Sequence, residues 1–197
     1  MKAINPLTHL DAYYVILGSQ SPRRKELLTN LGLSYKTLVS DAEEVIPDDM
    51  EVMEAPAYLS KLKSDDLMSQ VRDNFLLITA DTVVIHKNKI LGKPKNSDDA
   101  INMISKLSDN THAVVTGVTV RSAAKIKTFS NTTLVTVAPL SKKEITWYVE
   151  NYNVMDKAGS YGIQDWLGVT KITKLKGSYC NVMGLPTDKL FRVLQEW

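Results

Sequence analysis

The sequence predicts a mixed α/β fold in which helices flank a twisted sheet. Apolar, β-branched runs alternate with amphipathic helical runs along most of the chain, which is the pattern of an α/β domain. The segments at 111–121 and 125–138 both alternate like strands and follow each other with only a turn between them. Such neighbours pair antiparallel, so a mixed sheet is expected rather than a purely parallel one.

The elements are expected in a simple alternating order. In the first half they are a strand at 13–17, a helix at 22–31, a strand at 34–40, an acidic loop at 41–51, a helix at about 54–71, and a strand at 75–85 that turns at Lys87-Asn88 and returns through 90–91. In the second half they are a helix at about 97–107, strands at 111–121 and 125–138, a helix at 141–150, a strand at 168–176 and a helix at 187–194. Apolar and β-branched runs predict the strands, and apolar residues at helical spacing predict the helices.

Three helix starts carry a capping signal. Ser21 is followed by a proline, which suits the first helical position because its missing N–H costs nothing there. Ser97 is followed by two aspartates, which favour the first turn of a helix. Ser141 and Glu144 have the spacing of a capping box. We therefore expect Ser21, Ser97 and Ser141 to be the N-caps.

The composition fits a globular protein and excludes several other classes. The chain has 197 residues, of which 44% are hydrophobic and 23% charged, and its net charge is +2. A charge this small does not predict a nucleic-acid partner, which usually meets a concentrated basic face. No apolar run is long enough to span a membrane, and the first residues contain no signal-peptide core. We expect one domain over 1–197 with a short N-terminal extension at 1–11, or two small lobes.

Cysteine and histidine usage does not predict a structural metal site. Cys180 is the one cysteine in the chain, so no internal disulfide can form, which fits a reducing cytoplasm. We interpret Cys180 as a small buried residue rather than a nucleophile. His86 and His112 have no metal-ligand spacing with each other or with Cys180, so no zinc site is expected.

The segment SPRR at 21–24 places two cations where helix physics disfavours them. With Ser21 as N-cap, Arg23 and Arg24 fall in the first helical turn, beside the positive end of the helix dipole. A cation there is disfavoured by roughly 0.3–1 kcal/mol. A bound anion removes this penalty, because free backbone N–H groups, the hydroxyls of Ser19 and Ser21 and two guanidiniums together make a phosphate cradle. The alternative is that both arginines point into solvent.

Asp81 interrupts an otherwise apolar strand at 76–85. Burying an unpaired carboxylate is expensive, so this side chain must be hydrogen-bonded, ion-paired or bound to a metal. We expect it at the floor of a cleft, where it holds Mg²⁺ or deprotonates a water molecule. The alternative is an aspartate exposed at a sheet edge.

The loop at 41–51 carries three acidic residues near its start, Asp41, Glu43 and Glu44. Acidic loops are usually only solvated. Beside a phosphate cradle, however, carboxylates and phosphates repel each other unless a divalent cation lies between them. Glu44 and Asp81 would supply oxygen ligands to such a cation and leave positions open for phosphate oxygens.

Three further polar residues are candidates for the same site. Lys93 stands between a flexible glycine and a rigid proline, which suits a fixed positive charge. Gln164 ends a glycine-punctuated loop, and its amide has both a donor and an acceptor for the edge of a base. Packing is the alternative interpretation of this loop. Lys63 lies inside a predicted helix, where a surface lysine is the usual interpretation.

Taken in order, these segments resemble the Maf family of nucleoside triphosphate pyrophosphatases over about residues 15–194. The motifs that carry the resemblance are SPRR at 21–24, the acidic pair at 43–44, the helix with Lys63, ADTVV at 80–84, GKP at 92–94, TGV at 116–118, DKAG at 156–159, YGIQ at 161–164, GSY at 177–179 and GLP at 184–186. Each motif alone is weakly specific, whereas the ordered set is highly specific.

The resemblance implies a fold and a reaction. The fold is a mixed sheet flanked by helices, Maf/ITPase-like, with two lobes around a substrate cleft and commonly in a homodimer. The reaction is hydrolysis of a nucleoside triphosphate between its α- and β-phosphates, giving a monophosphate and pyrophosphate, with a divalent cation such as Mg²⁺, Mn²⁺ or Co²⁺. The sequence around Gln164 resembles the branch that acts on dTTP and UTP, with modified pyrimidine nucleotides as further candidates, rather than the 7-methyl-GTP branch.

The resemblance also implies roles for individual residues. Asp81 matches the proton acceptor that activates water, and Glu44 matches a carboxylate associated with the metal. The remaining matches are the phosphate-binding cations Arg24, Lys63 and Lys93 and the base-selecting positions Arg23, Thr82 and Gln164. The phosphate cradle described above adds the substrate-binding hydroxyls of Ser19 and Ser21. This set suits a triphosphate, since its nearly four negative charges meet four cations and a metal site.

The chain departs from the family pattern at four positions. Asp165 and Trp166 follow Gln164, where the family usually has glycine, so a carboxylate and an indole are expected beside the base pocket. Ser64 stands where alanine is common, and Ala42 stands where a larger residue often precedes the acidic pair. Neither Ser64 nor Ala42 changes the proposed charges.

A different class of function uses the same cations. A nucleotide-binding regulator of cell division or septum formation would bind phosphates without efficient hydrolysis. The pair of Asp81 and Glu44 separates the two hypotheses, because a pure binder does not need these carboxylates. Without a metal they would repel a phosphate.

Overall fold

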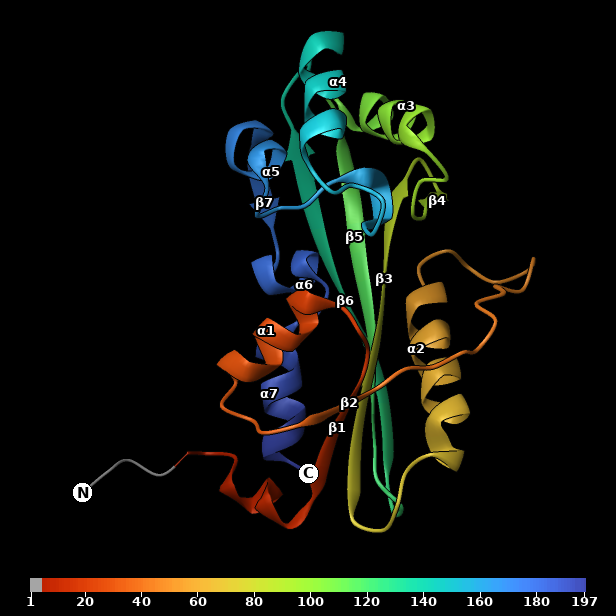
Figure 1. Cartoon of the computed structure of the whole chain (residues 1–197), viewed down its shortest axis with the longest axis vertical. Coiled ribbons are helices and arrows are strands. Elements are labelled where there is room, and N and C mark those ends of the chain that lie inside the picture. Colours follow the sequence, from red (N-terminus) through yellow and green to blue (C-terminus); the bar gives the residue numbers. More distant parts are fainter. Residues whose placement is uncertain (1–4) are drawn as a thin grey trace. The chain divides into compact units, whose positions relative to one another are not determined.

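The chain folds around a seven-stranded sheet flanked by helices (Figure 1). The computed structural model describes residues 5–197. The strands are β1 (Tyr14–Gly18), β2 (Lys36–Leu38), β3 (Phe75–His86), β4 (Lys89–Leu91), β5 (Thr111–Arg121), β6 (Ile126–Val137) and β7 (Ile172–Lys176). The helices are α1 (Pro22–Asn30), α2 (Ala55–Asp66), α3 (Ser97–Leu107), α4 (Lys142–Asn151), α5 (Trp166–Lys171), α6 (Tyr179–Met183) and α7 (Thr187–Gln195), with short 3₁₀ helices η1 (Thr8–Ala12), η2 (Leu67–Ser69) and η3 (Ala158–Ser160).

The sheet is mixed, which confirms the predicted fold class. The strand order is β2-β1-β3-β5-β6-β7, with β4 paired to β3. β1 runs parallel to both β2 and β3, whereas the β3–β4 and β6–β7 pairs are antiparallel. A tight turn, in which the Ser122 N–H donates to the Lys125 carbonyl at 2.8 Å, joins β5 to its neighbour β6. In the turn between β3 and β4, Lys87 and Asn88 have φ values of 48° and 58°, as a two-residue hairpin loop requires.

The chain divides into two compact units, each described separately below. Unit 1 contains the described chain up to Asp81 together with Thr116–Asn131 and Gly184–Trp197. Unit 2 contains Thr82–Val115 and Thr132–Met183. The strands β3, β5 and β6 contribute residues to both units.

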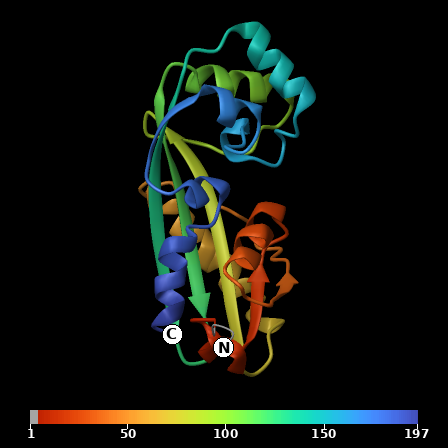
Figure 2. The same cartoon turned by 90° about the vertical axis from the view of Figure 1, so that its left-hand side faces the viewer.

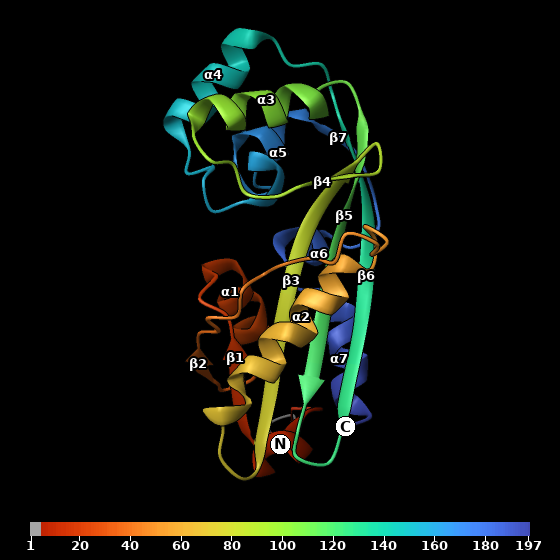
Figure 3. The same ribbon diagram turned by 90° about the vertical axis from the view of Figure 1, so that its right-hand side faces the viewer.

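In unit 1, α2 covers one face of the sheet and α1 and α7 cover the other (Figures 1, 2 and 3). Gly117 on β5 permits the close approach of α2, because a Cβ atom there would lie 2.2 Å from the Pro56 carbonyl oxygen. Part of the core is a cluster of buried side chains from β1, β3 and η2, namely Ile16, Leu67, Phe75 and Leu77. β3 is buried along its whole first half, which explains the continuous apolar run in the sequence.

In unit 2, α3 packs against α4 and η3. These helices and α5 lie over one face of this part of the sheet (Figures 2 and 3). The predicted capping box of α4 is confirmed: the Ser141 hydroxyl accepts from the Glu144 N–H, and the Glu144 carboxylate accepts from the Ser141 N–H. His112 is buried on β5, and its Nε2 atom lies 2.7 Å from the hydroxyl of Tyr161.

The predicted strand at 168–176 is partly wrong. Residues 166–171 form the helix α5, and β7 begins at Ile172. Gly168 allows this helix, since a Cβ atom at that position would lie 1.9 Å from the Ile163 carbonyl oxygen. β-Branched residues at 169 and 170 resembled a strand, but packing of the short helix against the preceding loop overrides that preference.

Other departures are smaller. Asn96, not Ser97, is the N-cap of α3, because its side-chain oxygen accepts from the Asp99 N–H at 2.9 Å. The strand expected at 34–40 is limited to Lys36–Leu38, and the helix α6 was not predicted. Cys180 on α6 is only partly buried. Among residues 5–197 no helix is both long and apolar enough to cross a membrane.

Candidate active site

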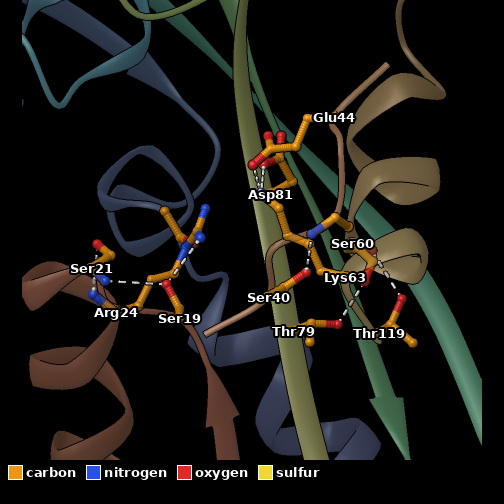
Figure 4. A network of polar contacts seen from close by, with 12 residues as sticks. Ser19, Ser21, Arg24, Ser40, Glu44, Ser60, Lys63, Thr79, Asp81 and Thr119 are labelled. Carbon is orange, nitrogen blue, oxygen red and sulfur yellow. Dashed lines mark hydrogen bonds and ion pairs between the residues drawn. The ribbon is translucent and has the colours of Figure 1, made fainter. Parts of the chain in front are cut away.

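Two carboxylates converge on one ammonium group in unit 1 (Figure 4). Nζ of Lys63, on α2, lies 2.5 Å from Oδ1 of Asp81 on β3 and 2.9 Å from Oε1 of Glu44 in the loop before α2. The side chains of Lys63 and Asp81 are 14% and 11% exposed, whereas that of Glu44 is 50% exposed. Lys63, which its helix position alone would assign to the surface and which the family resemblance assigns to the site, is therefore at the centre of the charged cluster.

The sheet presents Asp81 toward α2. β3 lies between β1 and β5, and Asp81 is 8% exposed, so the alternative of an aspartate at an exposed sheet edge is wrong. Thr79, two residues earlier, lies on the same face of the strand. Its hydroxyl donates to the Ser60 carbonyl at 2.7 Å, one helical turn before Lys63. The Ser60 hydroxyl lies 2.9 Å from that of Thr119 on β5 (Figure 4). These hydroxyls fix α2 against the sheet beside the charged cluster, and sequence reasoning did not single them out.

The segment at 21–24 begins α1 as the sequence predicts. Ser21 is the N-cap and accepts from the Arg24 N–H, with the proline at the first helical position. The Ser19 hydroxyl accepts from the Ser21 N–H at 3.2 Å and from Nη1 of Arg24 at 3.3 Å. Nε of Arg24 donates to the Gly184 carbonyl at 2.9 Å. The guanidinium of Arg24 is therefore held by the protein on two sides, contrary to the alternative that it points into solvent.

The electrostatics link Arg24 to the carboxylate pair. Burial is the largest influence and lowers the pKa of Arg24 below its usual value. The negative charges of Asp81 and Glu44 oppose this effect, while the neighbouring Arg23 adds to it. An arginine stays protonated under all ordinary conditions, so Arg24 is a partly desolvated fixed cation. Such a group gains free energy when an anion binds next to it.

The carboxylate pair fits a cation that is only partly coordinated by protein. Nowhere in residues 5–197 do three or more His, Cys, Asp or Glu side chains gather so that they alone could hold a metal ion. Mg²⁺ usually binds through one or two carboxylates and completes its shell with water and substrate phosphates. Asp81 and Glu44 supply such a pair of carboxylates, and their shared ammonium marks a place where positive charge is stabilised. The residues therefore fit a substrate-associated divalent cation better than a resident structural metal.

The other three predicted residues belong to unit 2. Thr82 directly follows Asp81 on β3 and is partly exposed. Lys93 is exposed in the segment after β4, where the carbonyl of the preceding Gly92 accepts from the Gly159 N–H at 3.0 Å. Gln164 is exposed in the segment before α5. The structure thus brings seven of the ten predicted residues into unit 1, namely Ser19, Ser21, Arg23, Arg24, Glu44, Lys63 and Asp81.

The two residues that depart from the family pattern are engaged by the packing of unit 2. Oδ2 of Asp165 accepts from the Tyr148 hydroxyl at 3.1 Å and lies 3.5 Å from Nζ of Lys157. The ring of Trp166 lies edge-on to that of Trp147, with centroids 5.2 Å apart. Both side chains anchor the segment that follows Gln164 to α4. The expectation that they alter a base pocket stays a prediction.

Structural comparison defines the fold class. The fold is similar to that in the structure of the Staphylococcus aureus Ham1 protein, with a TM-score of 0.51, covering 93% of this chain and 96% of that chain. The two sequences are 13% identical, so this similarity concerns the fold alone.

Sequence comparison identifies the family. Residues 14–197 match the sequence model of a family described as Maf-like protein, and the chain therefore belongs to the Maf family. A dTTP/UTP pyrophosphatase of Bacteroides fragilis is 46% identical over 192 residues, which cover 96% of this chain and 99% of that protein. Proteins of the same name from Porphyromonas gingivalis and Flavobacterium johnsoniae are 44% and 42% identical, over 97% and 94% of this chain and 98% and 95% of their own lengths.

Proposed function

We propose that this chain is a nucleoside triphosphate pyrophosphatase that hydrolyses dTTP and UTP to the monophosphate and pyrophosphate with a divalent cation. The observation that carries the proposal is the convergence of Asp81 and Glu44 on Lys63. Both carboxylates also interact electrostatically with Arg24. Three curated relatives named dTTP/UTP pyrophosphatase, at 42–46% identity over nearly the whole chain, support the choice of reaction and of substrates.

The cations of unit 1 suit the triphosphate. Among the predicted site residues of unit 1, three positive charges (Arg23, Arg24 and Lys63) stand against two negative charges (Glu44 and Asp81). Arg24 is already oriented by Ser19 and Gly184, so little side-chain freedom is lost when a phosphate binds. The positive end of the α1 dipole lies at this turn and favours an anion. We assign phosphate binding to Arg24 and Lys63, with Ser19 and Ser21 shaping the cradle.

Asp81 is the proposed general base. It accepts a proton from a water molecule whose oxygen attacks the α-phosphorus. The bond from the α-phosphorus to the bridging oxygen breaks, and its electron pair leaves with pyrophosphate. Positive side chains stabilise the charge that develops on the leaving oxygens. The products are one nucleoside monophosphate, one pyrophosphate and the proton held by Asp81.

Glu44 and Asp81 would hold the divalent cation. When bound, that cation would draw charge from the phosphate oxygens and lower the pKa of a coordinated water molecule. In its absence, Lys63 offsets part of the negative charge of the same two carboxylates. This arrangement limits the repulsion that the carboxylates exert on an incoming triphosphate.

The residues of unit 2 keep the roles that the family resemblance implies. We assign phosphate binding to Lys93 and base choice to Thr82 and Gln164, together with Arg23 of unit 1. A homodimer, a cytoplasmic location and the choice among Mg²⁺, Mn²⁺ and Co²⁺ also stay predictions.

A panel of nucleotides tests the proposal directly. Purified protein is incubated with each common nucleoside triphosphate, with 5-methyl-UTP and with 7-methyl-GTP, in the presence of Mg²⁺ or Mn²⁺. We expect equal amounts of monophosphate and pyrophosphate, with dTTP and UTP turned over fastest. Absence of turnover with every nucleotide and metal would refute the proposal. Nucleotide binding without metal or product would instead favour the regulator of division.

A further inference from the structure

Asp66 stands where helix physics disfavours an acidic side chain. It is the last residue of α2, at the negative end of the helix dipole. A carboxylate there costs roughly 0.3–1 kcal/mol when it is exposed. Oδ2 of Asp66 accepts from the Ser40 hydroxyl at 2.8 Å and from the Asp41 N–H at 3.1 Å. Through these two hydrogen bonds the carboxylate holds a segment outside its own helix.

The bonds fix the first part of the loop that carries Glu44. The Ser40 hydroxyl donates to Asp66 and at the same time accepts from the Ala42 N–H at 3.2 Å. Three successive loop residues are therefore tied to one carboxylate oxygen, directly or through Ser40. A further turn, from the Val45 N–H to the Glu43 carbonyl at 2.9 Å, follows around Glu44.

One turn of α2 thus holds both ends of this short stretch. Asp66 holds residues 40–42, and Lys63, three residues earlier on the helix, contacts Glu44 at 2.9 Å. Residues three apart are neighbours on a helix surface. Glu44 is half exposed on a loop, so polar contacts rather than packing must decide where its carboxylate lies.

We propose that Asp66 is a positioning residue that holds Glu44 beside Asp81 and thereby sets the affinity of the carboxylate pair for its divalent cation. The inference rests on the proposed function only in assigning cation binding to Glu44 and Asp81. Asp66 itself would touch neither cation nor nucleotide. It would act through the loop backbone, as residues behind a metal ligand commonly do.

Binding of Mn²⁺ without nucleotide tests the inference. The loss of the free Mn²⁺ signal in electron paramagnetic resonance measures the affinity of each variant. We expect Asp66→Ala to weaken Mn²⁺ binding by about tenfold, the usual lower limit for removing a partner behind a ligand. Asp66→Asn should restore most of the affinity, because its amide oxygen can still accept from both loop donors.

Asp65→Ala is the matched control. Asp65 is also a carboxylate in the last turn of α2, but its partners are Lys61 at 2.6 Å and Arg121 at 2.5 Å. This variant removes the same charge from the same helix end without touching the loop. We expect its Mn²⁺ affinity to stay within about twofold of the wild type, since exposed ion pairs contribute little.

A double-mutant cycle shows whether Asp66 acts through Glu44. In a Glu44→Gln background, Asp66→Ala should have no further effect on Mn²⁺ affinity, because the residue it positions no longer supplies a carboxylate. Equal effects of Asp66→Ala in both backgrounds would overturn the inference. So would wild-type affinity in Asp66→Ala, or a wild-type protein that binds no Mn²⁺.

A milder variant covers the case in which Asp66→Ala does not fold. Ser40→Ala removes one of the two donors to Asp66 and the acceptor for the Ala42 N–H. We expect a loss of Mn²⁺ affinity by about threefold, and an unchanged affinity would overturn the inference.

The experiments distinguish a failure of this inference from a failure of the proposed function. Weakened Mn²⁺ binding in Asp66→Ala, with no turnover of any nucleotide by the wild type, would refute the proposed function and leave the inference standing.

Discussion

Nζ of Lys63 lies 2.5 Å from Oδ1 of Asp81, and the same ammonium lies 2.9 Å from Oε1 of Glu44. The lysine comes from a helix, the aspartate from a central strand and the glutamate from a loop. One positive charge thus neutralises part of two negative charges, and the lysine and aspartate side chains are largely buried whereas the glutamate is half exposed. Any divalent cation that binds to Asp81 and Glu44 must compete with this ammonium.

Asp81→Asn should abolish turnover while nucleotide binding persists. The amide keeps the size of the side chain but cannot take a proton from water, and general bases contribute about 10²–10⁴-fold to rates. Steady-state release of pyrophosphate from dTTP measures turnover, and calorimetry measures binding. Near-normal turnover in this variant would show that another group is the base.

Lys63→Met should destabilise the protein and tighten its binding of Mn²⁺. Removing the ammonium leaves two carboxylates facing each other, which should lower the free energy of unfolding by roughly 3 kcal/mol. A divalent cation then binds without competition, so we expect Mn²⁺ to restore more stability to this variant than to the wild type. Urea unfolding with and without Mn²⁺ measures both effects.

Lys61→Met serves as the control for that prediction. Lys61 lies on the same helix and pairs with Asp65 at 2.6 Å, but it is half exposed and does not contact the carboxylate pair. Its loss should change the free energy of unfolding by less than about 1 kcal/mol and leave the Mn²⁺ response unchanged. Equal responses of the two variants to Mn²⁺ would contradict competition between Lys63 and the cation.

Arg24→Lys should weaken the binding of the triphosphate although the positive charge is kept. The guanidinium uses Nε for the Gly184 carbonyl and Nη1 for the Ser19 hydroxyl, and a lysine cannot keep this geometry. We expect KM for dTTP to rise by about tenfold, the cost of roughly one charged hydrogen bond. Lys25→Met, in the same helical turn, should leave KM within about twofold, and a similar rise there would count against the role of Arg24.

The protein should lose stability in acid through His112. Burial, with a smaller effect of the neighbouring His86, lowers the pKa of His112 from 6.5 to about 4. The unfolded chain therefore binds a proton near pH 6.5, whereas the folded chain does so only near pH 4. The contribution is complete above pH 6.5 and falls as the pH drops to about 4, by about 3 kcal/mol in all.

His112→Gln isolates that contribution from other titrating groups. Urea unfolding of this variant and of the wild type is compared from pH 7 to pH 4. The stability difference between the two proteins should shrink as the pH falls, because only the wild type has this histidine to protonate. A difference that stays constant across the range would mean that His112 is not the buried group that titrates.

Much of the fold could be predicted because local signals and tertiary packing agree. The apolar run before Asp81 is a central strand, and Ser141 with Glu144 is a capping box, as expected. Local signals failed where a tertiary contact decided the outcome. The β-branched residues of α5 favour a strand, but Gly168 lets the segment pack as a helix against Ile163.

In the candidate site, too, local rules predict some features, whereas tertiary contacts decide others. Ser21 at the N-cap, and the need of Asp81 for a partner, follow from rules of helix ends and of buried charge that act over a few residues. The family resemblance included Lys63 in the site, but its pairing with Asp81 could not be predicted, since the two residues are 18 positions apart. The role of Asp66 could not be predicted either, because the helix expected at about 54–71 places it in the helix interior and its partners lie in a loop 25 residues away.

The sequence by itself determined the mixed α/β class, the family, and the residue types that could serve a phosphate and a cation. These depend on periodicity, capping and ordered motifs, which are properties of short segments. Only the tertiary structure decided which charges meet: Lys63 between Asp81 and Glu44, and Arg24 between Ser19 and Gly184. The physical reason is that ion pairing depends on distances of a few ångströms between atoms that the chain separates by many residues.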